Sequence, residues 1–205
     1  MRRASGGVLV VLLLALCASF CLTRTAEVDT HWHLLAGRVI LARHEVPRAD
    51  DFTYTSTGNA WVDLQWLFEA VLAWFERSGG WPALDLLKVL VLVTGFGCAL
   101  VAARRRASPL AVVGVGLTAL LAAQERFALR PEAASFLCLS VLLLLLTWRH
   151  DHPRGIYAAI PLLTLWANMH ALYVVGLAAM LLVAAGDGLE VCLGGAGGRG
   201  AGAAA

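Results

Sequence analysis

Long apolar runs, separated by short polar turns, make up most of the chain. They cover residues 8–22, 83–103, 108–123, 133–148 and 156–186. A helix needs about 20 apolar residues to cross the hydrocarbon core of a bilayer, at about 1.5 Å of rise per residue. The last run is too long for one such helix, and Asn168-Met169-His170 interrupts it. We therefore expect two short helices that meet at this polar bend.

The first apolar run follows Met1-Arg2-Arg3 at the start of the chain. A basic start before an apolar run fits either a spanning helix or a cleaved signal peptide, whose apolar core is shorter. We favour the spanning helix.

Residues 61–78 have a weaker apolar pattern. Their large apolar residues repeat at helical spacing: Trp61, Leu64, Phe68, Val71, Leu72 and Phe75. Asp63, Glu69 and Glu76 interrupt this hydrophobicity. A helix that lies at the membrane interface, with its tryptophans at the headgroup level, fits this mixture better than a spanning helix does.

The composition agrees with a membrane protein. Hydrophobic residues make up 60% of the 205 residues and charged residues 15%, which is far from the usual balance of a soluble domain. The formal net charge of +2 is too small to indicate nucleic-acid binding, and the basic residues lie in short clusters between the apolar runs. We expect membrane lipids as partners and no nucleic acid.

The basic clusters predict the orientation in the membrane. They lie at residues 2–3, 104–106 and 149–154, and basic residues favour the cytoplasmic side of spanning helices. Residues 23–82, 124–131 and 168–170 then lie outside. The expected fold is an all-α polytopic bundle of about six transmembrane helices. Its N-terminus is cytoplasmic, its first extracytoplasmic loop carries interfacial helices, and the expected location is the inner (plasma) membrane.

The C-terminal segment differs from the rest. Residues 1–190 form the expected transmembrane region, and residues 191–205 consist mostly of glycine and alanine. With so few large apolar side chains the tail cannot bury a core, so we expect it to be disordered. Its abrupt start after a spanning helix suggests a truncated or frameshifted reading frame.

Two acids and two histidines follow the first apolar run. In a helix that starts at Asp29, the side chains of Asp29 and His33 share one face. Asp29 could then act as general base for an acceptor hydroxyl, or bind a divalent cation beside a phosphate. The alternative is a helix-capping acid. The spacing of His31 and His33 is too weak a signal to predict a metal site.

A second acidic cluster contains Asp50 and Asp51, between Pro47 and a turn-forming segment. These acids could orient a sugar or bind a metal ion. A solvated turn is the more common explanation for such a sequence.

The predicted outer turn at residues 124–131 places Arg126 and Arg130 outside, against the usual charge bias. A phosphate is a suitable partner, because a guanidinium offers paired donors and keeps its charge. The alternative is an internal ion pair with Glu125, Glu132 or Asp29. Asn168 and His170 lie at the same depth, either as substrate contacts or as a hydrogen-bonded pair at the helix break.

Several motifs resemble those of bacterial membrane proteins related to the GT-C glycosyltransferases. The motifs, which span residues 1 to about 190, are Asp29-Thr30-His31-Trp32-His33-Leu34, Val46-Pro47-Arg48-Ala49-Asp50, Phe52-Thr53-Tyr54-Thr55, Trp61-Val62-Asp63, Gln65-Trp66-Leu67, Arg126-Phe127, Arg130-Pro131 and Leu165-Trp166-Ala167-Asn168-Met169-His170.

This resemblance implies a polyprenyl-phosphate-linked sugar donor and a catalytic acid in the first extracytoplasmic loop. The matching acid is Asp29, with Glu27 as second choice, where members of that superfamily commonly have two adjacent acids. Arg126 and Arg130 would bind the donor phosphate. From the residue patterns described above, the expected substrate contacts are His33, Asp50, Asp51, Asn168 and His170. No cofactor is certain, although a divalent cation is an option. The alternatives are a transporter or flippase and a non-catalytic membrane subunit.

Overall fold

The regular structure of the chain is helical. The computed structural model describes residues 2–22 and 27–197, and no β-strand occurs among them. The helices are α1 (Arg2–Cys21), α2 (Val28–Arg43), α3 (Trp66–Arg104), α4 (Pro109–Ala123), α5 (Pro131–Trp148), α6 (Ala159–Met169) and α7 (Tyr173–Gly197), with 3₁₀ turns at Gln124–Arg126 and Pro153–Ala158. The predicted all-α fold is confirmed.

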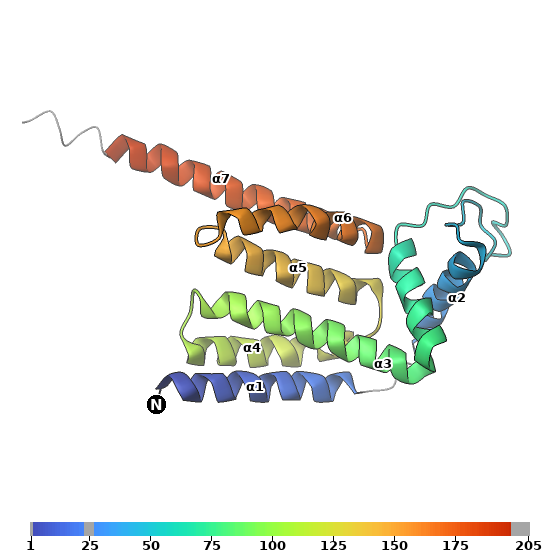
Figure 1. Ribbon diagram of the computed structural model, residues 1–205, viewed down its shortest axis with the longest axis horizontal. Coiled ribbons are helices and arrows are strands. Elements are labelled where there is room, and N and C mark those ends of the chain that lie inside the picture. The colour runs from blue at the N-terminus through green and yellow to red at the C-terminus, as the bar shows by residue number, and fades with distance from the viewer. Residues whose placement is uncertain (1, 23–26, 198–205) are drawn as a thin grey trace, which may run out of the picture.

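The helices form a bundle with a smaller helical unit at one end (Figure 1). α1, α4, α5, α6, α7 and the second half of α3 run side by side. α2 and the first half of α3 pack together beyond the end of this bundle. The α4–α5 turn and the α6–α7 break lie at this same end, whereas the α3–α4 and α5–α6 turns lie at the other.

A sharp break divides α3. Gly79 and Gly80 have non-helical backbone angles, and Gly80 has φ of 64°, a value that glycine adopts without a steric penalty. A continuous helix of 39 residues would be about 58 Å long, almost twice the hydrocarbon thickness of a bilayer. Residues 81–104 alone give about 36 Å. We therefore place the membrane-spanning part of α3 after the break and residues 66–78 outside it.

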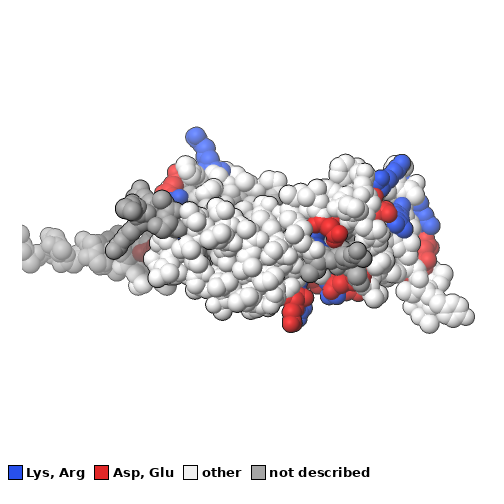
Figure 2. Space-filling view, turned by 90° about the horizontal axis from the view of Figure 1, so that it is seen from below, with Lys and Arg blue, Asp and Glu red and all other residues white. Residues whose placement is uncertain are grey.

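Three described helices are long and apolar enough to cross a membrane: α3, α5 and residues 173–194 of α7. This supports the prediction of a membrane protein. The expected number of about six crossings is not confirmed, because the apolar part of α1 is shorter than a span, and α4 and α6 have 15 and 11 residues. On the face shown in Figure 2, charged side chains gather toward the left of the molecule and again from its middle to its right-hand end, with an uncharged surface between these two regions.

The predicted bend after residue 168 is present. α6 ends at Met169, His170 is extended, and α7 begins at Tyr173. However, α7 has 25 residues and is not short. It continues through Gly197, so residues 191–197 of the glycine- and alanine-rich tail are helical, and residues 198–205 lie outside the described part of the chain.

A glycine allows α2 to pack closely on the first half of α3. A Cβ atom at Gly37 would overlap the backbone carbonyl oxygen of Glu69 and lie 3.0 Å from the Cβ of Ala73. Leu34, Phe68 and Leu72 form a buried apolar cluster beside this contact. Small residues allow this kind of close helix approach.

The substitution Gly37→Ala should therefore lower the free energy of unfolding by about 2–3 kcal/mol, as overpacking in a dense core does. Gly114→Ala in α4 is the matched control, because nothing lies within 4 Å of a Cβ atom there. At an open helical position alanine normally stabilises by about 0.5–1 kcal/mol. Thermal unfolding of both variants in detergent is the measurement. Equal melting temperatures for the two variants would contradict this account of the contact.

Candidate functional site

The structure brings Glu27, Asp29 and Arg130 together, although more than 100 residues separate the acids from the arginine. Arg130 Nε donates a hydrogen bond to Glu27 Oε2, and its terminal nitrogen lies 3.3 Å from Asp29 Oδ2. The carboxylate of Glu27 raises the pKa of Arg130 further. The three side chains are partly exposed, so their ion pairs stabilise the fold little and leave the acids accessible.

The start of α2 places Glu27 and Asp29 beside the α4–α5 turn. Glu27 occupies the N-cap position of α2 and its side chain makes no cap hydrogen bond. Asp29 lies in the first turn, so the alternative of Asp29 as the capping acid is wrong. Thr30, which is fully buried, donates from its hydroxyl to the carbonyl oxygen of Leu129 at 3.1 Å. This bond fastens the start of α2 beside Arg130.

A small polar pocket lies beside this cluster, and Glu27 and Arg130 line it whereas Asp29 does not. It has a volume of about 60 Å³ and is lined by Glu27, Glu125, Arg126, Ala128, Arg130, Glu132 and Ala133. Within the part of the chain that the structure describes, Arg126 forms no ion pair and its side chain is exposed. The internal ion pair, the alternative to a phosphate partner, is therefore present for Arg130, while the guanidinium of Arg126 is available to an anion.

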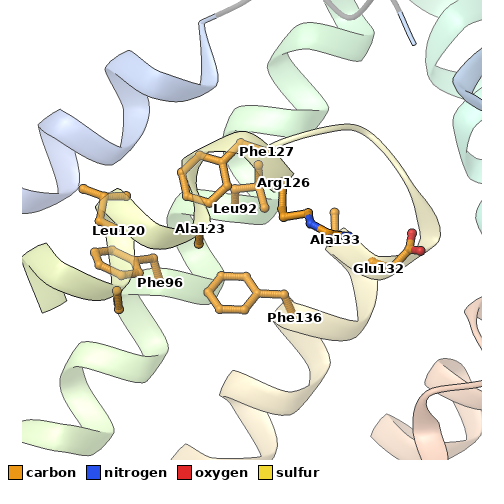
Figure 3. Close-up of a pocket in the computed structure, with 10 residues that line it drawn as sticks. Leu92, Phe96, Leu120, Ala123, Arg126, Phe127, Glu132, Ala133 and Phe136 are labelled. Carbon is orange, nitrogen blue, oxygen red and sulfur yellow. The ribbon is translucent and has the colours of Figure 1, made fainter. Parts of the chain in front are cut away.

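An apolar cavity of about 240 Å³ adjoins the polar pocket. It lies between α3, α4 and α5, where the rings of Phe96, Phe127 and Phe136 surround it (Figure 3). Arg126 and Glu132 belong to the lining of both spaces. An apolar chain ending in an anionic group matches this combination, because burial of the chain and charge pairing with Arg126 act together.

His33 faces a different partner. Its Nδ1 lies 2.8 Å from Oε1 of Glu69, and both side chains are buried. The ring also packs edge-on against Phe68 at 5.9 Å. His33 lines neither of the two spaces described above. The structure therefore does not bring this predicted substrate contact to the pocket.

Asn168 and His170 fasten the α6–α7 break to neighbouring helices. Asn168 Oδ1 accepts a hydrogen bond from Trp66 Nε1 at 3.0 Å. Ser135 Oγ accepts from Trp166 Nε1 at 2.7 Å, which leaves its own hydrogen to donate to His170 Nδ1 at 2.8 Å. Burial lowers the pKa of His170, and the charge of Glu132 acts in the opposite direction. Both side chains thus have structural partners at the break, but they bond to other residues and do not form the hydrogen-bonded pair that was the alternative.

Asp50 and Asp51 are engaged within their own loop. Asp50 is buried and accepts the backbone N–H groups of Phe52 and Thr53 at 2.9 Å each. The hydroxyl and the backbone N–H of Thr53 lower the pKa of Asp50. Asp51 forms an ion pair with Arg43 at 2.6 Å. Neither acid lines the pockets around Arg126, and the contacts of Asp50 are those of a turn-forming aspartate.

No group of three or more histidine, cysteine, aspartate or glutamate side chains is arranged to hold a metal ion among residues 2–22 and 27–197. The apolar cavity and the partnership of Glu69 with His33 could not be inferred from the sequence. A signal for Glu69 was present, since Phe68 and Leu72 place it on the apolar face of a helix, where a carboxyl needs an internal partner.

No protein-family model, curated protein or solved structure matches the chain. The resemblance to the GT-C glycosyltransferases, which depends on short motifs, therefore stays a prediction.

Proposed function

We propose that the chain is a membrane glycosyltransferase, or the N-terminal part of one, that moves a sugar from a polyprenyl-phosphate donor to an acceptor on the extracytoplasmic face. The observation that carries this proposal is that Arg126 lines both spaces. An apolar cavity can take part of an isoprenoid chain, and the polar pocket beside it is lined by Arg126, which has no ion pair among the described residues, and by Glu27. Asp29 lies next to this pocket through its ion pair with Arg130.

In the proposed reaction, the hydroxyl oxygen of the acceptor attacks the anomeric carbon of the sugar. The new C–O bond forms as the bond from that carbon to the phosphate oxygen breaks, and the lipid phosphate leaves with the bonding electrons. Asp29 takes the hydroxyl proton as general base, with Glu27 as second candidate. Direct displacement from the opposite face inverts the configuration of the anomeric carbon.

The two arginines have different roles in this proposal. Arg126 pairs with the phosphate of the donor, whose negative charge grows as the lipid phosphate leaves. Arg130 holds Glu27 and Asp29 in place through the ion pairs described above and also contributes positive charge to the pocket. This division refines the expectation that both arginines bind phosphate directly.

A topology of about six crossings, with a cytoplasmic N-terminus in the inner membrane, would place this site outside. The arrangement in Figure 1 supports it, because α2, the α4–α5 turn and the α6–α7 break share one end of the bundle. The basic clusters near Arg105 and Arg149 follow helices that run toward the opposite end, where Arg105 pairs with Asp151.

A non-catalytic membrane subunit is the second candidate function. It is favoured by the pairing of both acids with Arg130, since an arginine that is matched inside the chain needs no ligand to balance its charge. Binding of the lipid without transfer of the sugar would distinguish this candidate, or a flippase, from an enzyme.

We predict that Arg126→Gln weakens the binding of polyprenyl phosphate by about 10-fold or more, because a charge-assisted hydrogen bond contributes about 1.5–3 kcal/mol. Arg77→Gln, at another exposed arginine, is the control and should bind as the unchanged protein does. Quenching of tryptophan fluorescence in detergent measures the affinity. Polyprenol without phosphate should bind more weakly and show no dependence on Arg126. Equal binding of both lipids would count against the phosphate site.

The full chain in lipid vesicles, given polyprenyl-phosphate sugar and a hydroxyl acceptor, should transfer the sugar. Asp29→Asn should lower the rate by about 100-fold or more, as expected on loss of a general base. Asp51→Asn removes a carboxylate that is similarly paired with an arginine and should change the rate less than about 2-fold. Transfer that survives Asp29→Asn would reject Asp29 as the base.

Single cysteines in a cysteine-free background should reveal the topology. Val28→Cys, Glu125→Cys and Ala171→Cys, all at exposed positions, should react with an impermeant thiol reagent from outside. Arg106→Cys, which is also exposed, should react only after the membrane is opened. Labelling of positions 28 and 125 from opposite sides would show that the acids and Arg126 do not share one compartment.

A further inference from the structure

One buried acid has no role in the proposed reaction. Glu69 lies in the first half of α3, and only 3% of its surface is exposed. Its Oε1 atom meets His33 Nδ1 at 2.8 Å, whereas its buried Oε2 atom has no hydrogen-bond partner in the described structure. An ionised carboxylate with an unpaired buried oxygen is costly.

A proton on Oε2 removes this cost. As a neutral acid, Glu69 accepts the N–H of His33 at Oε1 and becomes a donor at Oε2. The neighbouring Asp63 supplies an acceptor, since its carboxyl lies close enough to interact with that of Glu69. Asp63 Oδ1 already accepts the backbone N–H of Gln65 at 2.9 Å, which holds this carboxyl at the start of α3.

We propose that Glu69 carries a proton, shared with Asp63, that latches α2 onto the first half of α3, and that loss of this proton loosens α2. The latch acts across a close contact of the two helices, because Gly37 of α2 packs against the backbone of Glu69 itself. A charge at Glu69 would therefore arise inside the interface, next to Leu34 and Phe68.

The groups around Glu69 set the direction of its titration. Burial raises its pKa to about 7, the nearby Asp63 acts in the same direction, and His33 acts in the opposite direction. His170 is a further titratable group near this cluster, because it interacts electrostatically with His33 and with Glu132. The pKa in the folded chain is thus above the ordinary value, so the stabilising effect of the proton is complete at low pH and is lost as the pH rises through about 7.

The latch would also control the candidate site. Asp29 lies one helical turn before His33 on α2, so a movement of α2 away from α3 would shift Glu27 and Asp29 relative to Arg130. This inference concerns the packing of α2 and does not require that the chain transfer sugar.

Infrared difference spectra and amide hydrogen exchange of the full chain in detergent test the latch between pH 5.5 and pH 8.5, a range chosen to bracket neutrality about 1.5 units on either side. The unchanged protein should show the C=O band of a neutral carboxylic acid that disappears as the pH rises. Over the same range, exchange in α2, corrected for the intrinsic effect of pH, should rise by about 10-fold or more.

Glu69→Gln should abolish both changes and keep α2 protected at high pH, because the amide donates and accepts as the neutral acid does. Glu45→Gln, at an exposed acid, is the control and should behave as the unchanged protein. Loss of the band in the unchanged protein without any change in α2 exchange would overturn the latch. So would a band, or a change in exchange, that persists in Glu69→Gln.

Asp63→Asn gives a second test if Glu69→Gln does not fold. It removes the neighbouring negative charge, so the loss of the band and the rise in α2 exchange should move together to lower pH. A midpoint that stays unchanged in Asp63→Asn would also overturn the proposal, since Glu69 would then not share its proton with Asp63.

Discussion

The contact of α2 with the first half of α3 is the constraint on which the candidate site depends. Because Gly37 has no side chain, the backbone of α2 can lie directly against the backbone carbonyl of Glu69. His33 forms a hydrogen bond with Glu69 in the same interface. Thr30 then ties the start of α2 to Leu129 in the α4–α5 turn. Because α2 is held at both places, its acids reach Arg130 from a segment far away in the sequence.

This arrangement separates two kinds of polar group that the sequence presents together. Glu27, Arg126 and Arg130 line a pocket beside an apolar cavity, and Asp29 pairs with Arg130 at its edge, so these groups can meet a ligand with a charged group and an apolar chain. His33 and Glu69 lie inside a helix interface, where they meet only each other and their neighbours. In the first set the charges lie at an open pocket, and in the second we propose that the protonation state affects the packing of α2.

Much of the fold could be predicted from local patterns, and much of the site could not. The helix break near Asn168 is visible as a polar interruption in a run too long for one span. The sequence around Asp50 fits either a ligand site or a turn, and only the bonds from Phe52 and Thr53 show that Asp50 caps its own loop. The partners of Arg130 and Glu69 come from distant segments, which residue spacing along the chain cannot reveal.

The sequence by itself determined the class of protein, because apolar runs of this length have to be buried in lipid or in other helices as α-helical structure. Tertiary structure decided which polar groups meet. Arg130 forms ion pairs with both Glu27 and Asp29. Arg126 has no ion pair within the described part of the chain and lines the apolar cavity. Glu69 is buried in the α2–α3 interface, where it bonds to His33. The physical reason is that helix formation depends on local hydrophobicity and backbone hydrogen bonds, whereas pairing of charges depends on how the helices pack.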